Sequence, residues 1–572
     1  MKSSVVAFVL IFAVVFSLHL PLLRLPYFWD EAGYYIPAAR DLLLTGSLIP
    51  HSTPSNAHPP LVMAYLALSW KIAGFSPRVT RTAMLLLSAF ALLGVFRLAR
   101  RVANPDVAVA ATICTALYPV FFAQSSMAHV DLAAAGLTLW GLDAYLGERW
   151  RGTACWFALA ALAKETAVLA PVALLAWEVV SPWLGKFRPL KGLVAQAYAA
   201  SLKRGPDTNR IDSPEAHPAS LPNSKRVPRP SSAWAGILLR SASLLAPVLV
   251  LCLWYVYHYA RTGYVFGNPE FFRYNVQSTL NPLRIVLAFF LRLWQAFGYM
   301  HLFVLTVLMG FAMMKPPLRD DGVERRRIDV PVQAVFAVLV LTYVAAMAVV
   351  GGAVLARYML PVVPLVILVA VATVWRRLPR WQLWIAFVAA AFVAALLLNP
   401  PDGFSPEDNL AYRDYVIMHE GAAAYLEDHY AQARVLTAWP ASDEISRPYL
   451  GYVQRPLSVV RIEDFTAEQV MAAAEERSRF DVALLFSTKY EPAHPVMPRW
   501  RVWEKLKERF FGYHHDLPPV IAAQLLGGHI VYEDHRPGQW VAVIEMERVY
   551  EARRGTPPSK RSPADTIRNL DN

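Results

Sequence analysis

The chain has 572 residues, of which 56% are hydrophobic and only 17% are charged, and its mean hydropathy is +0.33. Soluble proteins usually carry about 25% charged residues, so this composition excludes an ordinary soluble protein. The net charge of +12 arises from basic residues in short loops between apolar blocks, a pattern that the positive-inside rule explains without a nucleic-acid partner. All three cysteines lie inside apolar segments, which argues against a disulfide framework or a cysteine metal site.

Apolar blocks near the length that spans a bilayer recur along the first 400 residues. They lie near 4–23, 82–99, 107–123, 130–146, 154–180, 234–258, 283–313, 331–350, 357–375 and 381–398. The first block lacks a small-residue cleavage site, so we interpret it as a retained helix with Lys2 in the cytoplasm. The basic loops after the second and fourth blocks then face the cytoplasm, as the positive-inside rule requires.

The fifth block contains a charged pair, Lys164-Glu165, and disturbs this count. If the block crosses once, the basic loop 183–233 and every later loop face the wrong side. Division into segments at about 154–163 and 167–181 restores the charge pattern and gives about eleven membrane segments. Charges at membrane depth are costly unless they line a polar cavity. We therefore predict a half-length helical hairpin whose tip approaches such a cavity, with one long helix containing a buried ion pair as the alternative.

Beyond the last apolar block the chain is hydrophilic, and the charge count places it on the non-cytoplasmic side. Helical periodicity at 413–429 and 466–478 alternates with β-rich runs, which favours a soluble α/β domain at 400–551. The expected strands are Arg434–Trp439, Leu457–Ile462, Asp481–Phe486, His529–Glu533 and Trp540–Glu545. Composition predicts a disordered tail at 552–572 and a flexible loop at 203–233. The predicted fold class is an α-helical polytopic membrane protein, with residues 1–399 as its membrane domain, followed by this α/β domain.

Two adjacent carboxylates, Asp30 and Glu31, follow the first span in the aromatic sequence PYFWDE. Aromatic residues are expected at a membrane interface, but a carboxylate in an apolar setting has a raised pKa and is a candidate base or metal ligand. Asp30 also precedes a helical run at 32–45, so capping of that helix is the structural alternative.

Three further positions are assigned to the same face. His58 precedes Pro-Pro-Leu and is a candidate ligand for a phosphate or hydroxyl, although a single histidine is usually structural. Asp131 opens the fourth apolar block, either as a helix-start residue or as a second carboxylate in the same cavity. Arg357 begins a later block, where arginine either snorkels to the interface or binds a phosphate through its planar guanidinium.

Taken in order, these motifs resemble the GT-C glycosyltransferases: the Trp-Asp-Glu loop, His-Pro-Pro-Leu, the aspartate at 131, the Lys-Glu hairpin and Arg-Tyr-Met-Leu-Pro at 357–361. The nearest likeness is to bacterial members of the protein O-mannosyltransferase and aminoarabinose transferase superfamily, including the Rgt-like branch, over about residues 1–400. The resemblance implies an inverting transfer of a hexose or pentose from a polyprenyl-phosphate donor. The implied acceptor is a glycan, lipid or protein at the outer face of the bacterial inner membrane.

The resemblance also implies roles for individual residues. Asp30 is similar to the general base, Glu31 is its supporting neighbour, and Asp131 is similar to a second acid that orients acceptor or sugar. Lys164 resembles the hairpin lysine near the lipid phosphate, and Arg357 is a second cation there. The other expected substrate-binding residues are His58, Glu165 and Tyr358.

The sequence departs from the aminoarabinose transferase pattern at Ala57-His58, where those enzymes usually carry Glu-Lys. Their metal site and lipid A acceptor are therefore not implied; no cofactor is required, and a divalent cation is compatible with the acidic residues. The alternatives are a transporter or flippase of polyprenyl-linked substrates, or a membrane-anchored sensor. The transporter fits less well, because the ionisable groups gather at the outer face and no internal repeat is present. The sensor fits less well, because such proteins rarely need so many spans and the outer carboxylate loop would have no purpose.

Overall fold

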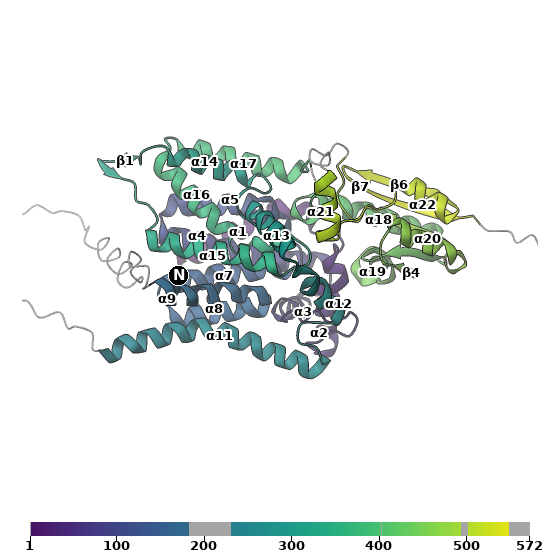
Figure 1. The fold of residues 1–572 in the computed structure, drawn as a ribbon, viewed down its shortest axis with the longest axis horizontal. Helices are drawn as coiled ribbons and strands as arrows, with labels where there is room; N and C mark the ends of the chain where they lie inside the picture. Colours follow the sequence, from purple (N-terminus) through teal and green to yellow (C-terminus); the bar gives the residue numbers. More distant parts are fainter. Residues whose placement is uncertain (1, 182–229, 402, 493–500, 548–572) are drawn as a thin grey trace, which may run out of the picture.

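The computed structural model describes residues 2–181, 230–401, 403–492 and 501–547. Figure 1 shows a bundle of helices at one end of the molecule and a β-sheet with its own helices at the other. The predicted tail at 552–572 lies outside the described residues, as does most of the predicted flexible loop. The last residues of that loop, 230–233, are described and begin a long helix.

The described helices of the bundle are α1 (Lys2–His19), α2 (Ile36–Thr45), α3 (Leu61–Ala73), α4 (Pro77–Val102), α5 (Pro105–Leu117), α6 (Pro119–Gln124), α7 (Val130–Leu146), α8 (Trp150–Ala163), α9 (Leu169–Val180), α11 (Pro230–Thr262), α12 (Pro269–Asn275), α13 (Pro282–Phe297), α14 (Leu302–Met313), α15 (Val330–Val349), α16 (Val363–Arg377) and α17 (Trp381–Leu397). Most of these helices coincide with the predicted apolar blocks, whereas α2, α3 and α12 lie between blocks. Local chemistry sets several helix starts. The side chains of Ser76 and Asn104 accept N–H groups in the first turns of α4 and α5, each of which begins with a proline.

Several of these helices fit a membrane by length and composition. Among the described helices, four are long and apolar enough to cross: Ser4–Leu22, Pro77–Val102, Leu238–Thr262 and Val330–Val349. A fifth candidate is the bent pair α13 and α14, and three apolar helices are shorter. These findings support a multi-pass membrane protein, while the count of about eleven segments stays a prediction.

The apolar block predicted at 283–313 is not one straight helix. Its two parts, α13 and α14, meet at 75°. The break falls where Met300 and His301 adopt positive φ angles of 48° and 63°. Residues with a side chain rarely adopt this left-handed conformation, and it cannot continue a right-handed helix.

The block that contains Lys164 is broken, as the charge count predicts. Lys164 has an extended backbone between α8 and a 3₁₀ turn at Glu165–Val168. The start of α8 and the end of α9 lie close together. Arg240 of α11 donates to Glu178, near the end of α9, at 2.6 Å, and its guanidinium lies over the ring of Trp150, the first residue of α8. The chain therefore turns back at Lys164, which agrees with the predicted hairpin and not with one long helix.

The C-terminal part forms an α/β sheet of five strands. Its elements are α18 (Ala411–His429), β3 (Arg434–Ala438), α19 (Ala441–Ser446), β4 (Ser458–Ile462), α20 (Ala467–Glu475), β5 (Val482–Phe486), α21 (Arg501–Phe511), α22 (Pro519–Leu526), β6 (Gly528–Arg536) and β7 (Gln539–Met546). The strand order is β4-β3-β5-β7-β6; β4, β3 and β5 are parallel, and β7 and β6 complete the sheet antiparallel. All five predicted strands form, and a short hairpin, β1 (Arg319–Asp320) and β2 (Val323–Glu324), lies within the bundle sequence.

The two parts share one hydrophobic core, which joins the loop after α1 to the start of the α/β part. Phe28 packs edge-on against Tyr412 and Tyr415 of α18, with ring centroids 5.9 and 5.2 Å apart. Burial of such a ring contributes roughly 1.5–3 kcal/mol. The α/β part therefore holds in place the loop that carries Asp30.

Candidate active site

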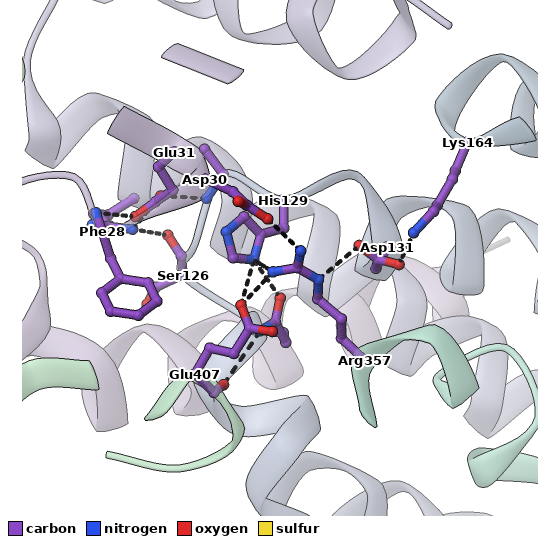
Figure 2. Close-up of polar contacts among 12 residues, drawn as sticks. Phe28, Asp30, Glu31, Ser126, His129, Asp131, Lys164, Arg357 and Glu407 are labelled. Carbon is purple, nitrogen blue, oxygen red and sulfur yellow. Dashed lines mark hydrogen bonds and ion pairs between the residues drawn. The ribbon is translucent and has the colours of Figure 1, made fainter. Parts of the chain in front are cut away.

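Arg357 is the centre of a buried cluster of charged residues, shown in Figure 2. It lies on a 3₁₀ turn, Ala356–Met359, just before α16. Its Nη2 donates to Asp30 Oδ2 and its Nη1 donates to Glu407 Oε2. Its Nε lies 3.4 Å from Asp131 Oδ2. One guanidinium therefore contacts three carboxylates, which come from segments far apart in the sequence.

Lys164 joins the cluster from the tip of the hairpin. Its Nζ donates to Asp131 Oδ1, so Asp131, in the first turn of α7, lies between Lys164 and Arg357. The ammonium also lies 3.9 Å from the centroid of the Tyr358 ring, an arrangement that stabilises a cation over an aromatic face. The structure thus brings together Asp30, Asp131, Lys164 and Arg357.

Asp30 is the accessible carboxylate of this cluster. Its side chain is 31% exposed, compared with 3% for Asp131 and 5% for Glu407. It occupies the position before the helical turn Glu31–Tyr35 but makes no capping hydrogen bond, so the capping alternative is not realised. Within the described chain, its Oδ1 accepts no hydrogen bond and is free for a ligand.

The backbone that presents Asp30 is unusual at the preceding residue. Trp29 has a φ of 41°, a conformation that bulky residues rarely adopt. Its carbonyl accepts the N–H of Gly33 at 2.9 Å, which starts the helical turn. Strained backbone of this kind persists only where surrounding contacts hold it, and it is concentrated at functional sites.

Glu31 differs from its neighbour and lies outside the Arg357 cluster. It is fully buried, and its Oε1 accepts from Arg81 at 2.6 Å and from the N–H of Ala128 at 2.5 Å. Its Oε2 accepts the N–H of Phe28 at 2.9 Å. Glu31 thus ties the Asp30 loop to Arg81 and to the segment before α7, and its oxygens are occupied by protein groups.

His58 and Glu165 form a second contact near the hairpin tip. His58 Nδ1 lies 3.1 Å from Glu165 Oε2. The imidazole is surrounded by the rings of Tyr34, Tyr35 and Phe271, at centroid distances of 5.7, 5.8 and 5.6 Å. The predicted residues His58 and Glu165 are therefore close to each other and fix the loop against the hairpin, without touching Arg357.

Two site residues, Glu407 and His129, were not selected from the sequence as site residues. Glu407 lies in a short turn after the last helix of the bundle, and the sequence analysis assigned that segment to a separate domain. His129 Nδ1 lies 3.1 Å from Arg357 Nη1 and 2.8 Å from Gln124 Oε1, and its Nε2 is buried without a partner in the described chain. The available signal was proximity in sequence: His129 is two residues before Asp131, and Glu407 opens an acidic pair after a span.

The cluster holds more acidic than basic groups. Burial raises the pKa of Glu407 to about 8 and that of Asp408, which accepts from Tyr299 at 2.7 Å, to about 7. Burial, and then the charge of Arg357, hold the pKa of His129 well below its ordinary value. Burial therefore favours the uncharged forms of His129 and Glu407.

A metal site is not apparent in the described ranges. No group of three or more His, Cys, Asp or Glu residues there is arranged to hold a metal ion. The position among the three carboxylates is filled by the Arg357 guanidinium.

Comparisons with known proteins show a family similarity over part of the chain. The family model of dolichyl-phosphate-mannose-protein mannosyltransferase matches residues 57–201, which include His58, Asp131 and Lys164. No curated protein matches by sequence. The crystal structure of ArnT from Cupriavidus metallidurans bound to undecaprenyl phosphate is 13% identical with a TM-score of 0.47, covering 95% of this chain and 98% of that one.

A second similar structure is the archaeal oligosaccharyltransferase AglB from Archaeoglobus fulgidus, in complex with an inhibitory peptide and a dolichol-phosphate. It is 12% identical with a TM-score of 0.44, covering 94% of this chain and 74% of that one. Likenesses of this size carry no argument about function, so the assignment depends on the family match. That match confirms the predicted resemblance of this chain to the GT-C glycosyltransferases.

Proposed function

We propose that the chain is an integral-membrane inverting glycosyltransferase that moves a hexose or pentose from a polyprenyl-phosphate donor to an acceptor. The observation that carries this proposal is the convergence of an accessible carboxylate, Asp30, with two cations, Lys164 and Arg357. The family match adds support, because its name describes sugar transfer from dolichyl phosphate. We assign the reaction to the extracytoplasmic face of a bacterial inner membrane, from the distribution of basic loops.

The chemistry needs a base and a stabilised leaving group. Asp30 accepts the proton of an acceptor hydroxyl through its free Oδ1 as the oxygen attacks the anomeric carbon. The bond between that carbon and the phosphate oxygen breaks, and the polyprenyl phosphate leaves with the electron pair. Lys164 and Arg357 stabilise the negative charge that develops on the phosphate. Attack opposite the leaving group inverts the anomeric carbon.

The remaining site residues have positioning roles in this scheme. Asp131 orients Lys164 and Arg357, because it contacts both cations. Glu31 holds the Asp30 loop through its contacts with Arg81 and backbone N–H groups, whereas His58 and Glu165 fix the hairpin tip beside the substrate. Tyr358 supports the Lys164 ammonium.

The α/β part is proposed to be an extracytoplasmic domain. Its first turn supplies Glu407 to the Arg357 cluster, so the candidate active site spans residues 1–399 and the start of residues 400–551.

The alternative, a transporter or flippase, is supported less well by the distribution of charge. Such a protein would place charged residues at the midplane of several spans. In the described bundle, buried carboxylates instead gather at its two ends: Glu31 and Asp131 at the candidate site, and Asp143 with Arg101 and Arg149 at the other end.

Replacement of the base tests the proposal. In vesicles supplied with a radiolabelled polyprenyl-phosphate sugar and envelope material as acceptor, Asp30→Asn is expected to reduce transfer by roughly 10²–10⁴-fold. The control is Asp106→Asn, at an exposed position in the first turn of α5. Full transfer by a folded Asp30→Asn protein would remove Asp30 from the role of base. Movement of the intact donor across the bilayer by the wild type, without cleavage of the sugar–phosphate bond, would favour the flippase.

A further inference from the structure

Trp439 lies at the edge of the sheet where ligands of α/β folds are usually bound. It directly follows β3, and the parallel strands β4 and β5 end at the same edge. The chain passes from β3 to β4 on one side and then returns to β5 on the other, so β3 stands at a switch in strand order. In open α/β sheets the crevice outside such carboxyl ends is the preferred ligand site.

This edge faces the loop that carries Asp30. The rings of Trp439 and Trp29 lie 5.5 Å apart at an interplanar angle of 83°, and Trp29 immediately precedes Asp30. Gly33 makes the approach possible, because a Cβ there would lie 2.5 Å from Trp439 Cζ2 and Nε1. The Trp439 indole is therefore held directly against the backbone of the candidate catalytic loop.

The two indoles have both exposed surface and unused hydrogen-bond donors. Trp439 is 39% exposed and Trp29 is partly exposed. Neither indole N–H donates a hydrogen bond within the described chain, whereas the buried Trp70 and Trp254 donate at 2.9 Å to Thr80 and to the Ala57 carbonyl. Indole N–H groups usually find a partner when they are buried. A ligand in this corner would meet the exposed aromatic surface of the two indoles and the Asp30 carboxylate.

We propose that Trp29 and Trp439 form the acceptor subsite and that the acceptor is a saccharide. This inference rests on the proposed function and names its acceptor class. A sugar ring presents a face of C–H groups, which packs on an aromatic ring, and a rim of hydroxyls. The rim supplies the hydroxyl that Asp30 deprotonates. An acyl chain has no hydroxyl to present to the Asp30 carboxylate.

A tryptophan near a membrane also fits the interfacial belt, where its ring lies among lipid headgroups. Contact of Trp439 with Trp29 and Gly33 directs the ring towards the loop, which favours the saccharide. The lipid belt is one outcome of the experiment.

The experiment compares Trp439→Ala, Trp439→Phe and the matched control Trp384→Ala. Trp384 is also 39% exposed but lies on α17, away from the Asp30 loop. Each full-length protein is placed in lipid nanodiscs with a polyprenyl-phosphate sugar. The acceptor probe is the envelope polysaccharide of a strain lacking this protein, cleaved to soluble oligosaccharides.

For Trp439→Ala, we expect the KM for the oligosaccharide to rise about tenfold, which corresponds to about 1.4 kcal/mol, and kcat to change less. Trp439→Phe should recover part of the loss, because it keeps an aromatic face without the N–H donor. Trp384→Ala should equal the wild type. Unchanged acceptor KM in Trp439→Ala, or transfer by the wild type to envelope protein or lipid in place of the oligosaccharide, overturns the proposal.

Calorimetric titration of the oligosaccharides without donor separates this inference from the proposed function. Weaker binding by Trp439→Ala than by the wild type supports the subsite even if no transfer is found, in which case only the enzymatic proposal fails. Equal binding by the two proteins overturns the subsite. Brominated lipids quench the fluorescence of tryptophans that lie among lipids. If they quench the wild type more than Trp439→Phe, and oligosaccharide does not change this, Trp439 belongs to the lipid belt and the subsite is overturned.

Discussion

Glu407 makes the stability of the protein depend on pH in a direction opposite to that of a normal ion-paired acid. Burial raises the pKa of its carboxyl from 4.5 to about 8, although Arg357 opposes the change. The unfolded chain therefore releases this proton at a much lower pH than the folded chain does. Stability is greatest below the unfolded pKa and falls as the pH rises towards the folded one.

The size of the effect follows from the width of that window. Well below pH 8 the folded protein holds the proton and the unfolded chain does not, so each pH unit costs about 1.36 kcal/mol, and this cost declines as the pH reaches the folded pKa. The free energy of unfolding should thus fall by roughly 2 kcal/mol between pH 6 and pH 8 through Glu407. Glu407→Gln keeps a neutral hydrogen-bonding side chain of the same shape and should remove this contribution.

The assay is thermal unfolding of purified protein at pH 6, 7, 8 and 9 in one detergent. The wild type should lose stability steadily towards pH 8, and Glu407→Gln should lose less, so that the two melting curves separate as the pH rises. Glu475→Gln is the matched control, since that carboxylate is exposed at the end of α20. Parallel loss of stability in the wild type and Glu407→Gln would refute the assignment of a retained proton to Glu407.

Other predictions address the cations, the loop and the topology. Lys164→Met leaves Asp131 without its closest partner and should destabilise the protein by about 3–5 kcal/mol. The double variant with Asp131→Asn should regain most of the melting temperature but not sugar transfer. Recovery of both would contradict the role of Lys164 at the phosphate. Glu31→Gln weakens charge-assisted bonds and should cost about 1.5–3 kcal/mol while reducing transfer less than Asp30→Asn does, which chemical denaturation and the transfer assay can measure together. A reporter fused after Gly205 should read cytoplasmic and one after Phe404 external; an external signal at 205 would mean that the predicted membrane orientation of the Lys164 hairpin is wrong.

Local patterns in the sequence predicted the elements well, because each depends on neighbouring residues. Short β-rich runs indicated β3 and β5, and the predicted bounds differ from the structure by one residue at one end of each strand. The hairpin at Lys164 was accessible for another reason: charge bias in the loops constrains how many times the chain crosses. The bend at Met300 and His301 was not predicted, although Gly298 and His301 interrupt the apolar run there.

The candidate site was accessible only in part, because it is built by contacts over long sequence distances. Membrane sidedness placed Asp30, Asp131 and Arg357 on one face, and the cavity argument added Lys164. The sequence could not show that one guanidinium contacts three carboxylates, because side-chain pairing depends on how α7 and α16 pack. Glu407 was not predicted as a site residue for the same reason, since its partner Arg357 is 50 residues earlier in the chain.

The two adjacent carboxylates of the loop after α1 show how packing assigns different roles to similar residues. Nothing in the sequence distinguishes Asp30 from Glu31, as both are acidic and follow the same aromatic run. In the fold, successive side chains of the turn point in different directions, so Glu31 enters the core beside Arg81 while Asp30 faces Arg357 and solvent. A carboxylate whose oxygens are filled by a cation and backbone N–H groups is a poor base, because protonation would sacrifice those bonds. Asp30 retains one free oxygen next to a shared cation, and that difference makes it the better candidate for proton transfer.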